Sequence, residues 1–277
     1  MSKFKVAGVQ MDIALADAEA NLISMEKLCP AAVSKGAQLV VFPECTLTGY
    51  CFDSLAEAQS VAQPIDGANV KRVVEIAKKN DTHVVFGMLE TGIEGAVYNS
   101  AVLVNGEGVV GVYHKTHMPF LGVDRFTTPG NRADQIFDVD GLRVGMNICY
   151  DCSFPESARV LALAGADIVV LPTNWPPGSG RVSDLIPNTR ALENNVYFMS
   201  VNRIGTEKGF DFIGKSKICD PKGGDVQFAN HANEAILIAE IDAEWARQKH
   251  LVAVPNQHEV HRFKDRRPDI YGPVTES

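Results

Sequence analysis

The chain has 277 residues, of which 45% are hydrophobic and 22% are charged, and its formal net charge is −8. This length suffices to bury a substantial core. An acidic chain without a run of five like charges lacks the positive field that would attract nucleic acids or anionic membrane surfaces. Neither is therefore an expected partner. No stretch approaches the roughly 20 apolar residues of a membrane span. With six cysteines and no secretion signal, we expect reduced thiols and a cytoplasmic protein.

Apolar runs of strand length alternate with helical patterns along the chain. The predicted strands are Phe4–Met11, Gln38–Phe42, Thr82–Met88, Val97–Val104, Val109–Tyr113, Leu142–Ile148, Asp167–Leu171, Val196–Asn202, Phe212–Ile218 and Ala235–Ile241. The predicted helices are Ala18–Lys35, Val70–Asn80, Pro155–Gly165, Val182–Asn195 and Ala243–Lys249. Runs such as "LVVF" and "DIVVLP" are apolar without alternation, which indicates strands buried on both faces beneath helices. The order predicts an α/β fold in which two mixed sheets are sandwiched between helix layers.

No linker or internal repeat divides the chain, so residues 1–277 are expected to form a single domain. The tail at 250–277 is polar and contains proline, and we expect it to wrap over the surface or over a partner subunit. The segment "GEGVVG" (106–111) fits a dinucleotide-binding glycine pattern, but a β-type sequence follows it where a helix is needed. Its glycines therefore predict a hairpin turn between two strands.

Two cysteines, Cys149 and Cys152, stand three positions apart after an apolar run, and three interpretations are open. They could form a redox-active CxxC pair. They could share a metal with His114 and His117, although that order and spacing differ from those of common zinc fingers. They could also be ordinary buried thiols, because free cysteine is among the most buried residue types. Cys149 fits burial less well than the others, since it ends a strand and a turn follows at once.

The ends of three apolar strands carry chemically complementary side chains. Cys149 closes one run, Glu44 closes "AQLVVFPE", and Lys115 closes "GVVGVYHK". Ligands bind at the carboxyl ends of strands in α/β sheets, and a nucleophile on a sharp strand-to-helix turn projects into that crevice. If the three ends converge, Glu44 can accept the thiol proton, and Lys115 can favour the thiolate and then an oxyanion. A Cys–His pair with His114 or His117 as the base is the alternative.

The blocks "VFPECTLTGY", "YHKTHMPF" and "NICYDCSFPESAR" resemble, in order and separation, the three signature blocks of the nitrilase superfamily of carbon–nitrogen hydrolases. The resemblance extends over nearly the whole chain, through "VAGVQMD", "VYNSAVLV", "ADIVVLPTNW" and "RRPDIYG". It implies a catalytic triad of Glu44, Lys115 and Cys149 and a four-layer α-β-β-α sandwich. It also implies association into homodimers or larger homo-oligomers, and chemistry that needs neither a metal nor an organic cofactor.

The resemblance further implies a reaction and a substrate class. Many members have a second glutamate after the lysine block, whereas here Asp124 is the only carboxylate between that block and the following "PG". Either Asp124 substitutes for it or the substrate is positioned differently. True nitrilases tend to have Trp-Glu after the nucleophile. The Tyr150-Asp151 pair in this chain is more like the amidase and carbamoyl-hydrolase branches.

We therefore expect a small linear, non-peptide amide as the substrate, hydrolysed through a cysteine thioester, with N-carbamoyl compounds or nitriles as alternatives. The backbone N–H of Tyr150 is a candidate oxyanion donor. Four further side chains follow the signature blocks and could line the substrate pocket, or could simply pack near a sheet edge: Tyr50, Phe120, Asn174 and Trp175. The rivals from other classes are a thiol-redox protein and a non-catalytic binding protein that keeps the fold alone.

Overall fold

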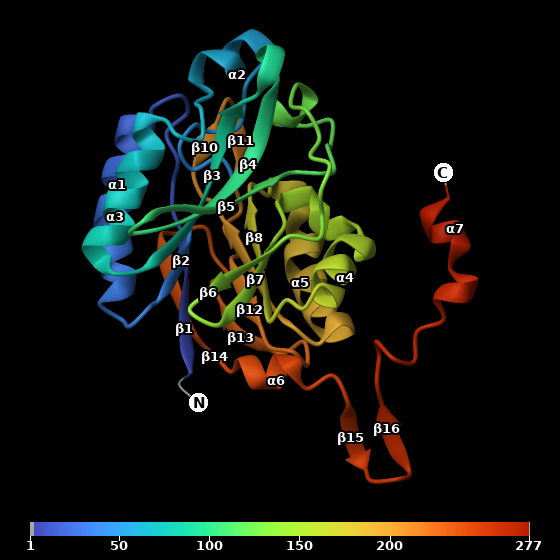
Figure 1. Ribbon diagram of the computed structural model, residues 1–277. Coiled ribbons are helices and arrows are strands. Elements are labelled where there is room, and N and C mark those ends of the chain that lie inside the picture. The colour runs from blue at the N-terminus through green and yellow to red at the C-terminus, as the bar shows by residue number, and fades with distance from the viewer. Residues whose placement is uncertain (1–2, 277) are drawn as a thin grey trace.

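The computed structural model describes residues 3–276 and contains two six-stranded mixed sheets (Figure 1). The first sheet has the strand order β14-β1-β2-β3-β4-β5. Its strands are β1 (Phe4–Gln10), β2 (Leu39–Val41), β3 (His83–Thr91), β4 (Val97–Asn105), β5 (Gly108–His114) and β14 (Ala235–Ile241). Strands β1, β2 and β3 are parallel, and β14, β4 and β5 are each antiparallel to their neighbours. The carboxyl ends of β2 and β5 consequently lie at the same edge of the sheet.

The second sheet repeats this plan, with the strand order β13-β12-β9-β8-β7-β6. Its strands are β6 (Ile136–Val139), β7 (Leu142–Met146), β8 (Ile168–Thr173), β9 (Tyr197–Asn202), β12 (Lys217–Cys219) and β13 (Asp225–Phe228). The central strands β7, β8 and β9 are parallel to one another. Their residues are buried almost without exception, as expected for strands covered on both faces.

Helices cover the outer face of each sheet, so the molecule has four layers in the order α-β-β-α (Figure 1). Helices α1 (Ala18–Val33) and α3 (Ala68–Asn80) pack on the first sheet, and α4 (Pro155–Leu163) and α5 (Gly180–Asn194) cover the second. Between the sheets, β1 approaches β9 so closely that a Cβ on Gly8 would lie 3.0 Å from Val201 Cγ2. The predicted α/β sandwich is therefore confirmed. Each predicted helix is present, and its bounds are within a few residues of those expected.

One predicted strand is wrong. Residues 212–218 are not a continuous strand, because the chain passes from β11 (Phe210–Asp211) through a loop before β12 begins at Lys217. Gly214 and Lys215 in this loop both have positive φ, which interrupts a regular strand. Asn202 Nδ2 donates to the carbonyl of Gly214 at 2.6 Å, and Gln10 Oε1 accepts from the backbone N–H of Ser216 at 3.0 Å. Side chains of β1 and β9 thus form hydrogen bonds with the backbone of this segment, in place of the strand-to-strand hydrogen bonds expected for residues 212–218.

The glycine-rich segment at 106–111 has the predicted conformation, because β4 and β5 form a hairpin in which Asn105 pairs with Gly108. Short elements that the sequence pattern did not indicate include α2 (Leu55–Val61), the edge strand β6 and the two-stranded β10 (Thr206–Glu207) with β11. Within the described part of the chain, no helix is long and apolar enough to cross a membrane.

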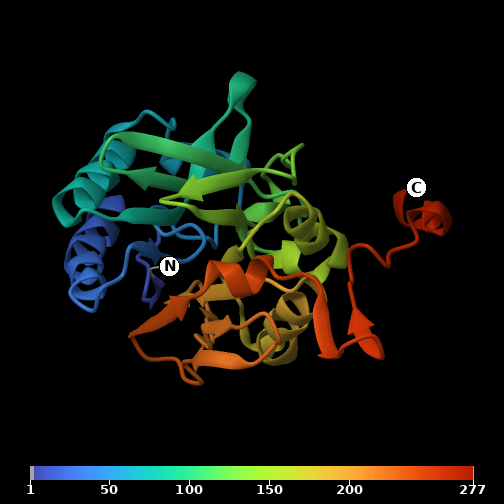
Figure 2. The same cartoon turned by 60° about the horizontal axis from the view of Figure 1, so that its bottom comes forward.

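The C-terminal segment leaves the four layers after α6 (Ala243–Arg247). It forms a hairpin of β15 (Leu251–Val254) and β16 (His258–Val260), and then the short helix α7 (Gly272–Thr275). Figures 1 and 2 both show this segment projecting from the body of the molecule. Three apolar side chains near its end are exposed: Ile270, Tyr271 and Val274.

Candidate active site

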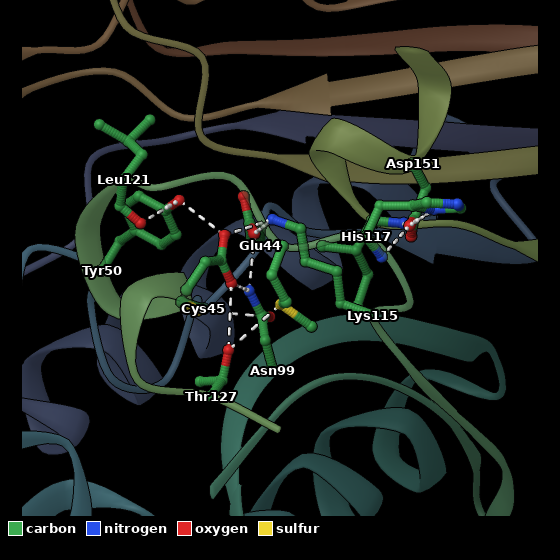
Figure 3. Close-up of polar contacts among 12 residues, drawn as sticks. Glu44, Cys45, Tyr50, Asn99, Lys115, His117, Leu121, Thr127 and Asp151 are labelled. Atoms are coloured by element: carbon green, nitrogen blue, oxygen red, sulfur yellow. Dashed lines mark hydrogen bonds and ion pairs between the residues drawn. The ribbon is translucent and has the colours of Figure 1, made fainter. Parts of the chain in front are cut away.

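Glu44 and Lys115 meet at one edge of the first sheet (Figure 3). Glu44 follows β2 and Lys115 follows β5, and both side chains are fully buried. Lys115 Nζ donates to Glu44 Oε1 at 2.8 Å. Cys149, which follows β7 of the second sheet, is 6% exposed and lies close enough for both charges to shift the pKa of its thiol. The expected convergence of an acid, an amine and a thiol from three strand ends is therefore present.

The backbone of the turn that contains Glu44 packs closely against β3. An added Cβ on Gly87 would lie 2.1 Å from the backbone nitrogen of Cys45, so only glycine fits there. Gly87 N donates to the carbonyl of Pro43 at 3.1 Å, and Leu47 N donates to the carbonyl of Gly87 at 3.1 Å. Cys45 itself has a φ of +51°. This close backbone approach fixes the direction in which the Glu44 side chain leaves the sheet.

Cys149 stands on the sharp turn that the sequence predicted. Its φ of +43° lies in the left-handed region, and the residue opens a single 3₁₀ turn, Cys149–Ser153, immediately before α4. For a residue other than glycine, such backbone strain costs of order 1–3 kcal/mol and persists only where the surroundings impose it. The strain presents the sulfur at the carboxyl end of β7.

Asp151 is the group that joins the lysine segment to the cysteine segment (Figure 3). Its fully buried carboxylate accepts from Tyr113 OH, Thr116 Oγ1 and the backbone N–H of His117, at 2.9, 2.9 and 3.0 Å. It also accepts from the backbone N–H of Ile148 at 2.9 Å. The first three donors flank Lys115, and the fourth precedes Cys149. One carboxylate therefore sets the position of the two strand ends relative to each other.

A polar network completes the surroundings of Lys115 (Figure 3). Asp124 is buried, and its Oδ2 lies 2.5 Å from Lys115 Nζ and 2.7 Å from Tyr50 OH. Asn99 Nδ2, from β4, donates to Glu44 Oε1 at 2.7 Å and to Asp124 Oδ1 at 2.9 Å. Lys115 thus lies between two carboxylates that Asn99 bridges. Asp124 and Tyr50 are candidates from the sequence, whereas Asn99, within the block "VYNSAVLV", was not predicted.

Burial and neighbouring charges set the ionisation of the three groups. Burial and the charge of Asp124 raise the pKa of Glu44, against the effect of Lys115. Burial disfavours charge on Lys115, yet Asp124 and Glu44 together raise its pKa well above the ordinary value. Burial and Glu44 raise the pKa of Cys149, against Lys115, the Thr173 hydroxyl and the backbone N–H of Asn174. Lys115 thus lowers the pKa of the thiol, in the expected direction, but burial and Glu44 outweigh it.

The free oxygen of Glu44 is the group best suited to take that proton. Oε1 is engaged by Lys115 and Asn99, whereas the buried Oε2 has no hydrogen-bond partner among the described residues. A buried carboxylate oxygen without a donor is rare and costly in a folded protein. Because the pKa of this carboxyl is raised, Glu44 is a stronger base than an exposed glutamate.

Both histidines of the lysine block are engaged away from the thiol. His114 Nε2 lies 2.8 Å from Glu90 Oε2, and its ring stacks on Tyr98. His117 Nδ1 lies 2.7 Å from Asp151 Oδ1, and its ring stacks on Phe154 with centroids 3.8 Å apart. These contacts disfavour the alternative of a Cys–His pair. Across residues 3–276, no group of three or more histidine, cysteine or acidic side chains is arranged to hold a metal ion.

Cys152 differs from Cys149 in its surroundings. It is buried, burial raises the pKa of its thiol to about 12, and both cysteines are free. Its carbonyl accepts from Arg190 Nε of α5 at 2.9 Å, which anchors the 3₁₀ turn to the helix layer. These features are those of a structural thiol within the turn.

The remaining candidates occupy different environments. Asn174 is fully buried after β8, and neither atom of its side-chain amide has a partner among the described residues. Trp175 is buried, and its backbone N–H donates to Asn202 Oδ1 at 2.8 Å. Tyr150 is 38% exposed with its ring edge against Phe154, and Phe120 is 91% exposed at the surface. Asn174 is thus available for hydrogen bonding, whereas the exposed ring of Phe120 does not line a closed pocket.

Comparisons with known proteins identify the family of the chain. Residues 5–250 match the Carbon-nitrogen hydrolase family. A nitrilase from Pyrococcus abyssi is 38% identical, with 96% of this chain and 98% of the relative aligned. An (R)-stereoselective amidase from a Pseudomonas species is 34% identical over 89% of this chain and 85% of the relative. The crystal structure of Saccharomyces cerevisiae Nit3, a member of branch 10 of the nitrilase superfamily, superposes with a TM-score of 0.80 at 26% identity, covering 92% and 96% of the two chains. The chain therefore belongs to the carbon–nitrogen hydrolase family of the nitrilase superfamily, whose members hydrolyse carbon–nitrogen bonds other than peptide bonds.

Proposed function

We propose that this protein hydrolyses a small linear amide through a thioester on Cys149, releasing ammonia and a carboxylic acid. The observation that carries the proposal is the buried Glu44 Oε2, which has no partner among the described residues, on a carboxyl whose Oε1 accepts from Lys115 Nζ at 2.8 Å. Burial and Glu44 raise the pKa of the Cys149 thiol, so the thiol needs a base. A neutral thiol cannot attack an amide efficiently, and an adjacent general base removes that obstacle.

In the first step, the sulfur of Cys149 forms a bond to the amide carbonyl carbon while the thiol proton passes to Glu44. Lys115 and the backbone N–H of Tyr150 stabilise the resulting oxyanion. When the tetrahedral intermediate collapses, the carbon–nitrogen bond breaks and Glu44 returns the proton to the leaving nitrogen. Ammonia departs, and an acyl thioester is left on Cys149.

In the second step, Glu44 takes a proton from a water molecule, whose oxygen attacks the thioester carbonyl. The carbon–sulfur bond then breaks, the carboxylic acid leaves, and Cys149 regains its proton from Glu44. All proton transfers use groups of the chain itself, so the proposed cycle needs neither a metal nor an organic cofactor.

Asp124 and Asn99 support this cycle in different ways. Asp124 lies 2.5 Å from Lys115 Nζ and helps to raise its pKa, so we propose that it substitutes for the second glutamate of the family. Asn99 donates to both Glu44 and Asp124 and so holds the two carboxylates on either side of Lys115. The unpaired amide of Asn174 is proposed to contact the substrate, and Tyr50 to orient Asp124.

An amide is the favoured substrate because Tyr150-Asp151 follows the nucleophile and because a relative that aligns over most of the chain is an amidase. N-carbamoyl compounds and nitriles are the alternatives, and another relative carries the name nitrilase. Ammonia release from small amides, ureido acids and nitriles separates the three classes. Cys149→Ala and Glu44→Gln should abolish the activity. Lys115→Ala should lower the rate by about 10²–10³-fold. Cys152→Ala should keep the wild-type rate.

Near-normal turnover by Cys149→Ala would exclude the proposed chemistry. A redox function would instead yield a reversible Cys149–Cys152 disulfide, detected as a loss of two hydrogens on oxidation. A non-catalytic binding protein would release no ammonia from any of the three classes.

We also propose that the protein is cytoplasmic, that residues 1–277 form one domain, and that it works as a homodimer or larger homo-oligomer. The exposed apolar side chains of Ile270, Tyr271 and Val274 lie on a segment that projects from the body, and we propose that this segment packs on a partner subunit. Light scattering of the full chain and of a chain ending at residue 249 tests this, since truncation should lower the number of subunits in the assembly. An unchanged number of subunits would contradict the role of the tail.

A further inference from the structure

A buried ion pair lies outside the proposed catalytic groups, in the segment from the end of β9 to the end of β10. Arg203 is fully buried and Glu207 is 3% exposed, and Arg203 Nη1 is paired with Glu207 Oε1. Removing two charges from water is costly, so such a pair is weak evidence of stability for its own sake. Its contacts indicate what it does.

The second oxygen of Glu207 holds the loop that follows Glu44. Glu207 Oε2 accepts from the backbone N–H groups of Tyr50 and Cys51, at 2.9 and 2.8 Å. At the preceding residue, Gly49, φ is +79° and an added Cβ would lie 2.9 Å from Glu207 Oε1. The loop therefore lies directly against the carboxylate, with no room for a side chain at position 49.

Arg203 in turn fixes the carboxylate. Its Nη2 donates to the carbonyl of Ile13 at 2.7 Å and to Asp12 Oδ1 at 3.1 Å, and its Nε donates to the carbonyl of Ile204 at 3.1 Å. The guanidinium lies over the Phe212 ring, 4.3 Å from its centroid. Five contacts, counting Glu207, leave this side chain little freedom.

The loop that Glu207 holds also places Tyr50 in the polar network around Lys115. Tyr50 OH lies 2.7 Å from Asp124 Oδ2, and the same oxygen of Asp124 lies 2.5 Å from Lys115 Nζ. A continuous chain of polar contacts thus runs from Arg203 through Glu207, Tyr50 and Asp124 to Lys115.

We propose that Glu207 is a positioning residue for the hydrolase reaction, which acts through Tyr50 to hold Asp124 and Lys115 in their catalytic arrangement. This inference rests on the proposed function. Glu207 touches neither Lys115 nor Cys149, so its effect on the reaction must pass through the loop. A displacement of about 1 Å at a catalytic group can lower a rate by about 10²-fold.

A double-mutant cycle on kcat/KM tests the inference, with the amide found by the ammonia-release screen as substrate. Glu207→Gln replaces one acceptor with an N–H group that faces other donors, and it should lower kcat by about 10- to 100-fold with little change in KM. In a Tyr50→Phe background, the same change should cost less than about threefold, because the connection to Asp124 is already broken. Equal losses in both backgrounds would overturn the proposal.

Asp12→Asn is the matched control. Asp12 also contacts Arg203, but its side chain is 67% exposed and it does not touch the Tyr50 loop, so kcat should stay near that of the wild type. Glu207→Asp, which keeps the charge but shortens the side chain, is the second variant if Glu207→Gln does not fold, and it should show the same dependence on Tyr50.

Hydrogen exchange separates failure of this inference from failure of the proposed function. In Glu207→Gln, the backbone amides of Tyr50 and Cys51 should exchange at least about tenfold faster, while amides of β8 stay protected. This readout needs no substrate. Unchanged protection at both amides would show that Glu207 does not hold the loop, whatever reaction the protein catalyses.

Discussion

Lys115 Nζ donates to Glu44 Oε1 at 2.8 Å and leaves Glu44 Oε2 without a partner among the described residues. One carboxyl group is thereby divided into an oxygen that is held in place and an oxygen that is free to accept a proton. The same contact helps to keep Lys115 charged, because the carboxylates of Asp124 and Glu44 raise its pKa against the effect of burial. The proposed general base and the proposed oxyanion stabiliser thus depend on each other.

The pH dependence of kcat/KM should reflect the raised pKa of Glu44. Only the deprotonated carboxylate accepts the thiol proton, and burial together with Asp124 raises its pKa above the ordinary 4.5. Activity should therefore fall on acidification with a midpoint above 4.5. A pH–rate profile under conditions in which the fold is intact by circular dichroism measures this midpoint. A midpoint at or below the ordinary value would contradict Glu44 as a base in a desolvated site.

Alkylation of Cys149 by iodoacetamide should depend on Glu44. If Glu44 removes the thiol proton, Glu44→Gln should slow the reaction at Cys149 by at least about tenfold, as measured by peptide mass spectrometry. A purely electrostatic role predicts the opposite, because the charge of Glu44 raises the pKa of this thiol and its removal would favour the thiolate. Faster labelling in Glu44→Gln would therefore exclude the general-base role, and Cys152 provides the internal reference.

Gly87→Ala should disturb the turn that carries Glu44. The new Cβ would lie 2.1 Å from the backbone nitrogen of Cys45, so the turn or β3 must move. We expect a loss of about 1–3 kcal/mol in the free energy of unfolding, as for other overpacked sites, and a lower kcat. Gly178→Ala is the control, since a Cβ there meets nothing within 4 Å. Wild-type kcat in Gly87→Ala would show that the turn tolerates displacement.

Asp151→Asn should loosen the connection between the lysine and cysteine segments. In the wild type, the Asp151 carboxylate accepts from several donors, including the backbone N–H groups of His117 and Ile148. The substitution replaces one of its oxygens with an N–H₂ group, which cannot accept from them. We expect about 1–3 kcal/mol lower stability in denaturant unfolding and a fall in kcat that exceeds any change in KM. Asp66→Asn, at an exposed position, should change neither. Equal stability of Asp151→Asn and the wild type would contradict the assigned role.

The sequence predicted the residues at strand ends better than those inside elements. Glu44, Lys115 and Cys149 each follow an apolar run, and parallel strands bring such ends together, so their convergence follows from pattern and topology. Asn99 lies within β4, where nothing in a strand sequence distinguishes a buried amide with a function from one that only fills space. Glu207 lies 157 positions from Tyr50 along the chain, and only the packing of the two sheets places it on the loop.

The failed strand at 212–218 has a similar cause. The segment has the apolar residues of a strand, but side chains of Gln10 and Asn202 take over its hydrogen bonds. Local propensity cannot anticipate such tertiary contacts. The extent to which burial raises the pKa of Cys149 also depends on tertiary packing, which the sequence does not show.

The most direct test of the central claim is mass spectrometry of the protein quenched in acid during turnover of a short-chain aliphatic amide. If Glu44, Lys115 and Cys149 act as proposed, the mass should increase by that of the acyl group less one hydrogen, and peptide mapping should place the adduct on Cys149. Cys149→Ala should acquire no adduct and release no ammonia. Ammonia release with the adduct on another residue, or steady turnover by Cys149→Ala, would contradict the account.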